Sequence, residues 1–283
     1  METGITIFTP TYNRAHLLNR LFESIKNLSY ENFEWLIVDD GSTDETEKLI
    51  NRFREKSKFK IIYVKQENQG KYMAINNGVK LANKELFFIV DSDDWLPNDS
   101  LNRIDEYYKK IKSNEGFAGV AGLKKVMNKN AESISLHENE FITNSLDFRF
   151  TYNYSGDVAE VYRTSVLKDY PFPEFKNEKF CTESLVGNRI AQKYNLLFFN
   201  QFIYDCEYHE EGLSANYNQL MMKNPKSSLL YYKELLSSWK YDDNELKLKF
   251  IKRFINIARN NRYSWFYIIR NLKLGDLIFY FRS

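Results

Sequence analysis

The sequence of 283 residues is poor in cysteine, glycine and proline, and it carries almost no net charge. Its two cysteines, Cys181 and Cys206, have the spacing of neither a metal site nor a redox motif. We interpret both as structural thiols in a reducing compartment. With only 11 Gly and 5 Pro, long disordered linkers are not expected. The formal net charge of +2 gives no support to nucleic-acid binding.

Long apolar runs are also missing. No charged start followed by an apolar run resembles a secretory signal, and no stretch approaches the ~20 apolar residues that a membrane span requires. These absences predict a protein that works in the cytoplasm, either free or peripherally on the inner face of the cell membrane. The Gly-x-Gly-x-x-Gly fingerprint is absent after the first apolar run, which argues against a dehydrogenase.

The first hundred residues alternate between short apolar runs and segments with apolar residues at helical spacing. This alternation predicts an α/β fold with a mainly parallel central sheet flanked by helices. The runs lack polar alternation, as strands buried on both faces do. The predicted strands are 5–8, 33–38, 59–64 and 86–90. Apolar pieces at 117–123, 158–162 and 196–204 predict an extension of the same sheet, and residues from 221 onward predict helices.

Polar clusters follow three of the four predicted N-terminal strands: TPTYNR, DDGSTD and DSDD. Ligands of parallel sheets bind beyond the carboxyl ends of the strands, so these clusters predict one binding site. Asp91, Asp93 and Asp94 repel one another unless they are solvated or bind a cation, and their hard oxygen atoms suit Mg²⁺ or Mn²⁺. The alternative is an acidic turn that caps the next helix.

The second cluster and the segment after the third strand offer groups for a nucleotide. A carboxylate of Asp39 or Asp40 can accept from a nucleobase N–H, although an ordinary turn capped through Ser42 or Thr43 is the alternative. Tyr12 can stack on a base, or simply pack. Lys71 can meet a phosphate, although surface lysines are common.

Four segments together resemble the family 2 glycosyltransferases in their residues, their order and their spacing. They are TPTYNR (residues 9–14), VDDGSTD (38–44), ENQGKYMAINNGVKLA (67–82) and FFIVDSDDWL (87–96). The resemblance is specific over about residues 4–100 and looser to about 220. It implies the A-type glycosyltransferase fold and transfer with inversion at the donor's anomeric carbon.

The resemblance also implies roles for individual residues. Pro10, Tyr12, Asp40 and Lys71 would contact the nucleotide, usually UDP. Asp91 would face the ribose or the metal, Asp93 would be the main metal ligand, and Asp94 would lie close by. His209 would complete the metal or phosphate site, although a solvated loop histidine is the alternative.

The catalytic base of the family is a carboxylate that opens a helix beyond the metal site, and Glu183 in KFCTESLVGNRIA occupies that place. Such a base removes the proton of the acceptor hydroxyl. A helix start with Thr182 as cap is the structural alternative. Glu178 and Glu174 are nearby rivals. Two further carboxylates, Asp157 and Glu160, are weak candidates for holding acceptor hydroxyls.

We expect a catalytic domain at 1–220, with the nucleotide-sugar site in 1–100 and the acceptor side in 101–220. Residues 221–283 form a helical extension with 13 Lys/Arg and 5 Asp/Glu. Its last part, 259–283, interleaves aromatic with basic residues, which is typical of helices on anionic membranes. The alternative is a helix docked on its own domain or on a second subunit.

The resemblance thus implies a transferase that passes a sugar from a UDP-sugar to a glycan or lipid-linked acceptor in surface polysaccharide synthesis. Two alternatives stay open. One is another nucleotide-binding class, such as a sugar-nucleotide pyrophosphorylase, although its Gly-rich basic loop is missing. The other is a non-catalytic relative that binds a partner through its C-terminal segment.

Overall fold

The computed structural model describes residues 2–127, 136, 138–154, 157–207, 212 and 215–282. The chain divides into two compact units. The first holds Met1–Pro171 and Arg189–Tyr208, and the second holds Phe172–Asn188 and His209–Ser283. None of the helices in the described part of the chain is long and apolar enough to cross a bilayer.

The first unit contains an eight-stranded mixed sheet with the order β3-β2-β1-β4-β7-β5-β8-β6. Six strands run in one direction, and only β6 and β7 oppose them. The strands are β1 (Ile5–Thr11), β2 (Phe33–Asp39), β3 (Lys60–Lys65), β4 (Leu86–Ile89), β5 (Phe117–Val126), β6 (Glu140–Thr143), β7 (Val158–Arg163) and β8 (Asn195–Cys206). This arrangement confirms the predicted α/β fold with a mainly parallel sheet.

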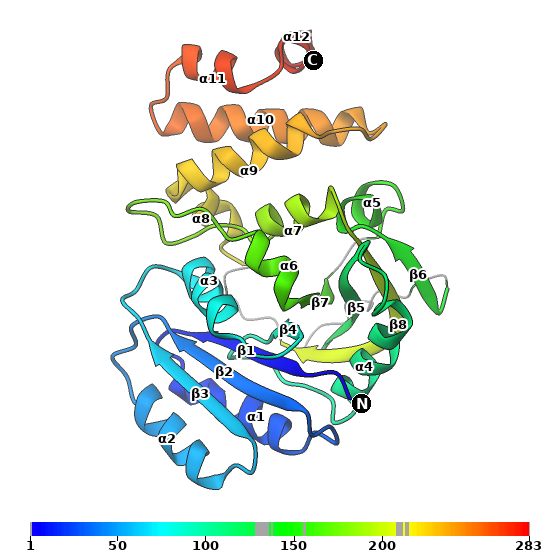
Figure 1. The fold of residues 1–283 in the computed structure, drawn as a ribbon. Coiled ribbons are helices and arrows are strands. Elements are labelled where there is room, and N and C mark those ends of the chain that lie inside the picture. The colour runs from blue at the N-terminus through cyan, green and yellow to red at the C-terminus, as the bar shows by residue number, and fades with distance from the viewer. Residues whose placement is uncertain are drawn as a thin grey trace. The chain divides into compact units, whose positions relative to one another are not determined.

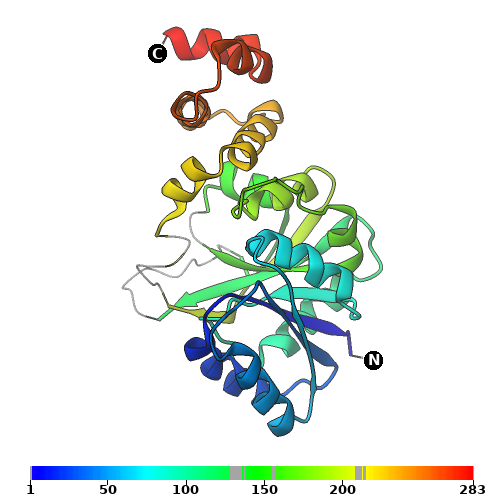
Figure 2. The ribbon, with the colours of Figure 1, turned by 90° about the vertical axis from the view of Figure 1, so that its left-hand side faces the viewer.

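Helices cover both faces of this sheet (Figures 1 and 2). The helices of the first unit are α1 (Ala15–Lys26), α2 (Thr46–Lys56), α3 (Lys71–Leu81), α4 (Ser100–Ile111), α5 (Ser145–Phe150) and α6 (Thr164–Asp169). On one face, α1, α2 and α4 share a core with alternate residues of the strands, such as Trp35 and Phe88. On the other face α3 lies against β1 and β2.

Apolar residues of α1 recur every three or four positions and are buried, as the helical spacing predicted. The strands β1 and β2 are buried along their whole length, which explains their unbroken apolar runs.

The second unit is helical. The boundary between the units falls within α7 (Ser184–Ala191), and the later helices are α8 (Tyr217–Lys223), α9 (Pro225–Ser237), α10 (Asn244–Asn260), α11 (Trp265–Asn271) and α12 (Leu274–Arg282). They share a core of their own around Tyr232, Phe254 and Ile268. The helical C-terminal segment predicted from the sequence is therefore present.

One local prediction is wrong. Neither Ser42 nor Thr43 caps α2, because the helix begins later, and Asp44 Oδ1 accepts from the Thr46 N–H at 3.1 Å. Ser42 Oγ instead accepts from Asn13 N at 2.8 Å, and Asn13 Oδ1 accepts from Thr43 N at 2.8 Å. These two bonds join the turns after β1 and β2, so the polar residues of the two turns are held side by side.

Candidate nucleotide site at the strand ends

The carboxyl ends of β1, β2 and β4 lie at one edge of the sheet, because the three strands are parallel neighbours. Pro10 is buried within β1 and pairs with Val38. Tyr12 follows at the end of β1 and is 48% exposed, so its ring is available to a ligand. The clusters predicted to meet are therefore neighbours in the fold.

Asp40 is buried and organises the segment that leads from β3 into α3. Its Oδ1 accepts from Gln66 Nε2 at 2.7 Å and from Gln69 N at 2.9 Å. Its Oδ2 accepts from Gly70 N at 2.8 Å. A carboxylate has about four acceptor positions, so one remains for a donor such as a nucleobase N–H.

The same segment positions Lys71. Gly70 precedes α3 with φ of 96°, a conformation that glycine adopts without strain, and Lys71 is the first residue of the helix. Lys71 Nζ lies 2.7 Å from Asp91 Oδ1. Asp40 therefore holds the segment between β3 and α3, and this segment places the Lys71 ammonium against the acidic turn.

The acidic turn after β4 consists of residues 91–94. Burial by itself would raise the pKa of Asp91, but the adjacent Lys71 charge and hydrogen bond lower it overall. Burial and the negative charge of Asp91 raise the pKa of Asp94 to about 7. Burial and the neighbouring carboxylates thus disfavour the ionised form of Asp94, and a bound cation would relieve this repulsion.

Protein groups also contact the other two carboxylates. Arg14 Nη1 lies 2.6 Å from Asp93 Oδ2, and the Tyr204 hydroxyl donates to Asp94 Oδ2 at 2.6 Å. The same hydroxyl accepts from the Asp91 N–H at 3.0 Å, and the Lys124 ammonium lies 4.5 Å from the centre of the Tyr204 ring. Tyr204 on β8 thereby ties two residues of the turn together.

A second set of contacts holds the far side of the turn. Arg20 Nη2 donates to the Asp93 carbonyl oxygen at 2.6 Å, and its guanidinium lies 3.8 Å over the Trp95 ring. Trp95 pairs with Asp205 through two backbone hydrogen bonds of 3.0 and 2.9 Å. The turn is therefore fixed to α1 and to β8 before any ligand binds.

The resemblance implies a divalent cation. The oxygen ligands that the acidic turn offers show whether such an ion fits there. In the part of the chain that the structure describes, no three His, Cys, Asp or Glu side chains gather into a metal cage. Two neighbouring carboxylates, Asp93 and Asp94, fit a cation that takes its remaining oxygen ligands from phosphates and water. His209, the predicted third ligand, lies outside the described residues.

The remaining candidate carboxylates have varied surroundings. Glu183 is exposed and directly precedes α7 in the second unit, while Thr182 is buried. Its rival Glu178 accepts from Lys226 N at 2.7 Å and Ser227 N at 2.9 Å, and so caps α9. Glu174 is exposed.

Of the two acceptor candidates, Glu160 accepts from the hydroxyls of Ser145 and Tyr162, both at 2.8 Å. Asp157 is exposed.

The sequence interpretation missed four side chains at the turn. Arg14 lay inside the quoted TPTYNR cluster without a role, while Arg20, Lys124 and Tyr204 belong to no cluster. A cation or a tyrosine on a distant element carries no local signal, because only the fold brings it to the turn.

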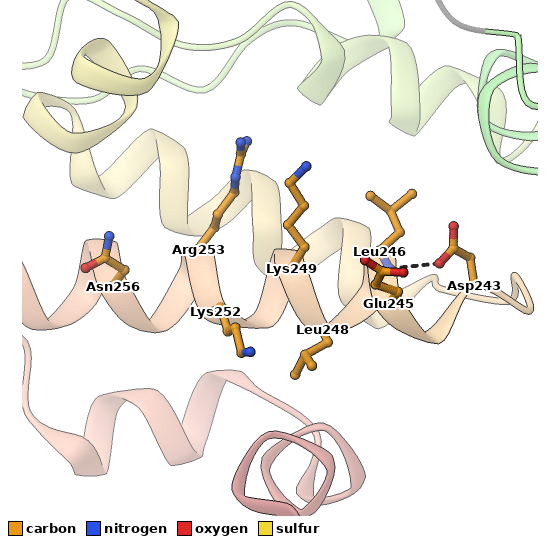
Figure 3. Close-up of a pocket in the computed structure, with 8 residues that line it drawn as sticks. All are labelled: Asp243, Glu245, Leu246, Leu248, Lys249, Lys252, Arg253 and Asn256. Carbon is orange, nitrogen blue, oxygen red and sulfur yellow. Dashed lines mark hydrogen bonds between the residues drawn. The ribbon is translucent and has the colours of Figure 1, made fainter. Parts of the chain in front are cut away.

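A groove elsewhere in the molecule has a different character. It measures about 780 Å³ and runs along α10, where acidic Asp243 and Glu245 mix with basic Lys249, Lys252 and Arg253 (Figure 3). Asp243 accepts from the Leu246 N–H at 2.8 Å and so caps the helix. Every residue that lines this groove belongs to α10 or directly precedes it, so the groove is the side of one helix and no strand end contributes to it.

The carboxylates and cations lie at the carboxyl ends of parallel strands, which is where α/β proteins bind their ligands. Residues 6–165 match glycosyl transferase family 2, which is more than half of the chain. The chain therefore belongs to this family.

A relative from Methanococcus voltae is named dolichyl N-acetyl-alpha-D-glucosaminyl phosphate 3-beta-D-2,3-diacetamido-2,3-dideoxy-beta-D-glucuronosyltransferase. It is 34% identical over 260 residues, which are 89% of this chain and 71% of the relative. The chain spans less of three other curated relatives, whose matched segments cover 15%, 40% and 49% of their lengths.

Solved structures show the same fold. Residues 1–349 of S. aureus TarS, solved with UDP-GlcNAc, superpose with a TM-score of 0.63 at 20% identity, covering 99% of this chain and 79% of that one. A mannosyltransferase from Pyrobaculum calidifontis, solved with GDP-Man and Mn²⁺, gives 0.59 at 17% identity, covering 98% and 78%. The predicted A-type glycosyltransferase fold is confirmed.

Proposed function

We propose that this protein is an inverting glycosyltransferase that transfers a sugar from a nucleotide-sugar, with UDP-sugars as the first candidates. The acceptor is a hydroxyl of a glycan or of a lipid-linked sugar, in the synthesis of a surface polysaccharide. The observation that carries the proposal is the acidic turn of residues 91–94, set among Arg14, Lys71 and Lys124 at the strand ends. Membership of the family supports it.

The donor's nucleotide is assigned to the first unit. The free acceptor position on Asp40 receives a nucleobase N–H, and the exposed Tyr12 ring lies against the base. Lys71 and Arg14 pair with phosphate oxygens, since both are basic side chains that lie beside the turn.

Asp93 and Asp94 would hold a Mg²⁺ or Mn²⁺ ion, which would neutralise charge on the diphosphate leaving group. The Mn²⁺ in the mannosyltransferase structure supports this choice of ion. Tyr204 and Arg20 keep the turn in place by the bonds described above.

Glu183 is the proposed base. Its carboxylate receives the proton of the acceptor hydroxyl as that oxygen attacks the anomeric carbon and the bond to the phosphate oxygen breaks. The name of the Methanococcus relative contains a dolichyl-linked phosphate, which supports a lipid-linked acceptor.

The test is calorimetry followed by turnover. UDP should bind more tightly with Mn²⁺ than with EDTA, and Asp93→Ala should remove that difference. Hydrolysis of a panel of UDP-sugars then identifies the donor. Equal binding of UDP in EDTA would refute the role of Asp93 in metal binding, and tighter binding of GDP, ADP or TDP would refute the choice of UDP.

A further inference from the structure

The last two helices turn apolar side chains in two opposite directions. Ile268, Leu272 and Leu277 point inward and are buried in the core that α11 and α12 share with α10. Three others point outward: Phe266 is 73% exposed, Leu274 is 72% exposed and Phe281 is 70% exposed. The two alternatives for this segment, internal packing and an external partner, thus apply to different faces of the same helices.

Exposed apolar residues of α11 and α12 lie together in one surface, which we call the apolar face: Trp265, Ile269, Leu274, Ile278 and Phe281. Along α12, Leu274, Ile278 and Phe281 follow one another at intervals of four and three residues, which places them on one side of the helix. Trp265 of α11 lies 6.0 Å from Phe281, measured between ring centres. A shallow hollow of about 500 Å³ lies in this face, lined by Ile269, Leu274, Leu277, Ile278, Phe281 and Arg282.

The charge around this face has one sign. Asp276 is the only acidic residue in 259–282, and it is only 2% exposed and lies 2.7 Å from Lys247 Nζ. The basic residues are exposed instead: Arg259, Arg262, Arg270, Lys273 and Arg282. The structure therefore removes the single negative charge of this segment from the surface. Two cations border the apolar face: Arg282 lines the hollow, and the Arg259 guanidinium lies 5.4 Å from the centre of the Trp265 ring.

Amphipathic helices of a globular protein turn their apolar stripe toward the core, and α12 turns such a stripe away from it. An apolar face with basic residues at its margin is the pattern by which helices lie in the surface of an anionic bilayer. We propose that the α11–α12 face binds an anionic lipid surface. The apolar face enters the boundary between headgroups and acyl chains, and the arginines contact the headgroups.

The size of the two helices fits a position in the plane of the membrane. α12 has nine residues, a length of about 14 Å, which is far short of the ~30 Å hydrocarbon core. The inference goes beyond the proposed transferase activity and does not depend on it, because none of these residues belongs to the strand-end site.

The test uses the full chain with point variants. Removing residues 259–283 would also remove the buried partners of α10, so a deletion would confuse binding with folding. Binding is measured by cosedimentation with vesicles of phosphatidylcholine, with and without phosphatidylserine. The protein should bind the vesicles that contain phosphatidylserine at low salt, and about 0.5 M salt should release it because salt screens the charges.

Two double variants separate the contribution of the apolar side chains to vesicle binding from that of the charged side chains. Leu274→Ser with Phe281→Ser should weaken binding by about 10- to 100-fold. Arg270→Gln with Arg282→Gln should weaken it by about 25-fold, at about fivefold for each cation.

Matched controls lie in the first unit. Ile142 is 56% exposed, the same as Ile269, so Ile142→Ser should not change binding while Ile269→Ser weakens it. Arg52→Gln with Lys56→Gln removes two exposed cations of α2 and should also leave binding unchanged. Circular dichroism and thermal unfolding of every variant check that both units stay folded.

The proposal is overturned if vesicles of phosphatidylcholine alone bind the protein as tightly as vesicles that contain phosphatidylserine. It is also overturned if both double variants bind the vesicles as tightly as the parent protein. It is also overturned if no vesicle binds and the protein forms a dimer that Ile278→Ser dissociates, because a second copy then covers the face. If the apolar double variant unfolds, the test rests on the double variant of Arg270 and Arg282. Both side chains are exposed, so replacing them should leave the fold intact.

Discussion

At the scale of single residues, the site depends on which carboxylate oxygens already accept hydrogen bonds or pair with a cation within the protein. Asp40 uses three hydrogen bonds to hold a loop, so its main task in the described structure is to position Lys71. Asp93 instead shares its carboxylate with Arg14 at the place where a cation would bind. The guanidinium would therefore compete with a bound metal ion for this side chain.

Replacing Arg14 tests this competition. In Arg14→Gln, Asp93 loses its guanidinium partner, and Mn²⁺ alone should bind about fivefold more tightly, which corresponds to ~1 kcal/mol for a partly exposed ion pair. Titration of Mn²⁺ without nucleotide, followed by electron paramagnetic resonance, measures the change. Arg54→Gln on α2 is the matched control. An unchanged or weaker Mn²⁺ affinity would show that Asp93 and Arg14 do not compete in this way.

Glu183 can be tested by a substitution that keeps its size. Glu183→Gln removes the proton acceptor and should slow transfer by about 10²–10⁴-fold while UDP binding stays the same. Transfer rates and calorimetric UDP affinity measure the two effects separately. A near-parental rate would reject this assignment, and loss of transfer in Glu174→Gln would move the role to that neighbour.

At the scale of elements, α3 connects the core to the site. Its Gly78 packs directly on β1, where an added Cβ would lie 2.2 Å from the Phe8 ring. The first residue of the same helix is Lys71, which contacts the acidic turn. The close approach of α3 to the sheet therefore helps to determine where Lys71 meets Asp91.

Two helical glycines allow a matched comparison. Gly78→Ala should destabilise the protein by about 1–3 kcal/mol, because overpacking against Phe8 outweighs the ~1 kcal/mol gain in helix propensity. Gly275→Ala in α12 meets no atom within 4 Å and should be neutral or stabilising. Denaturant unfolding measures both, and Phe8→Leu should partly rescue Gly78→Ala. Equal stability of the two alanine variants would contradict the close contact.

At the scale of the whole molecule, two units with separate cores divide the chain. The groups proposed to hold the nucleotide lie in the first unit, and the apolar face lies in the second. The first unit carries 25 Lys/Arg and 28 Asp/Glu, a net charge of −3, and the second carries 15 Lys/Arg and 10 Asp/Glu, a net charge of +5. A diphosphate that brings more negative charge to the first unit therefore needs a local cation.

Ligand binding should raise the stability of the molecule accordingly. UDP with Mn²⁺ at about 100 times its Kd adds about 2.7 kcal/mol. That gain corresponds to a rise of about 5–10 °C in Tm for a chain of this size. Differential scanning fluorimetry with UDP, Mn²⁺, both and EDTA measures it. Equal shifts with and without Mn²⁺ would mean that the nucleotide binds without a metal.

The linear sequence was sufficient for the four N-terminal strands and for the edge of the sheet at which the candidate site lies, but it did not predict β6, α5 or α6. Apolar runs and helical spacing are local patterns, so the four N-terminal strands were found to within a few residues. The polar turns could be assigned to one edge because parallel strands present their carboxyl ends together. The motifs supplied the family, which residues 6–165 confirm.

Only the tertiary structure decided which groups meet. Lys71 and Asp91 are 20 positions apart, Arg14 and Asp93 are 79 apart, and Tyr204 and Asp94 are 110 apart. No local pattern records such pairings, because strand order and helix packing create them. The orientation of α12 was decided in the same way. Its composition is amphipathic whichever way it faces, and packing against α10 buried Leu277 and Asp276 while leaving Leu274 and Phe281 exposed.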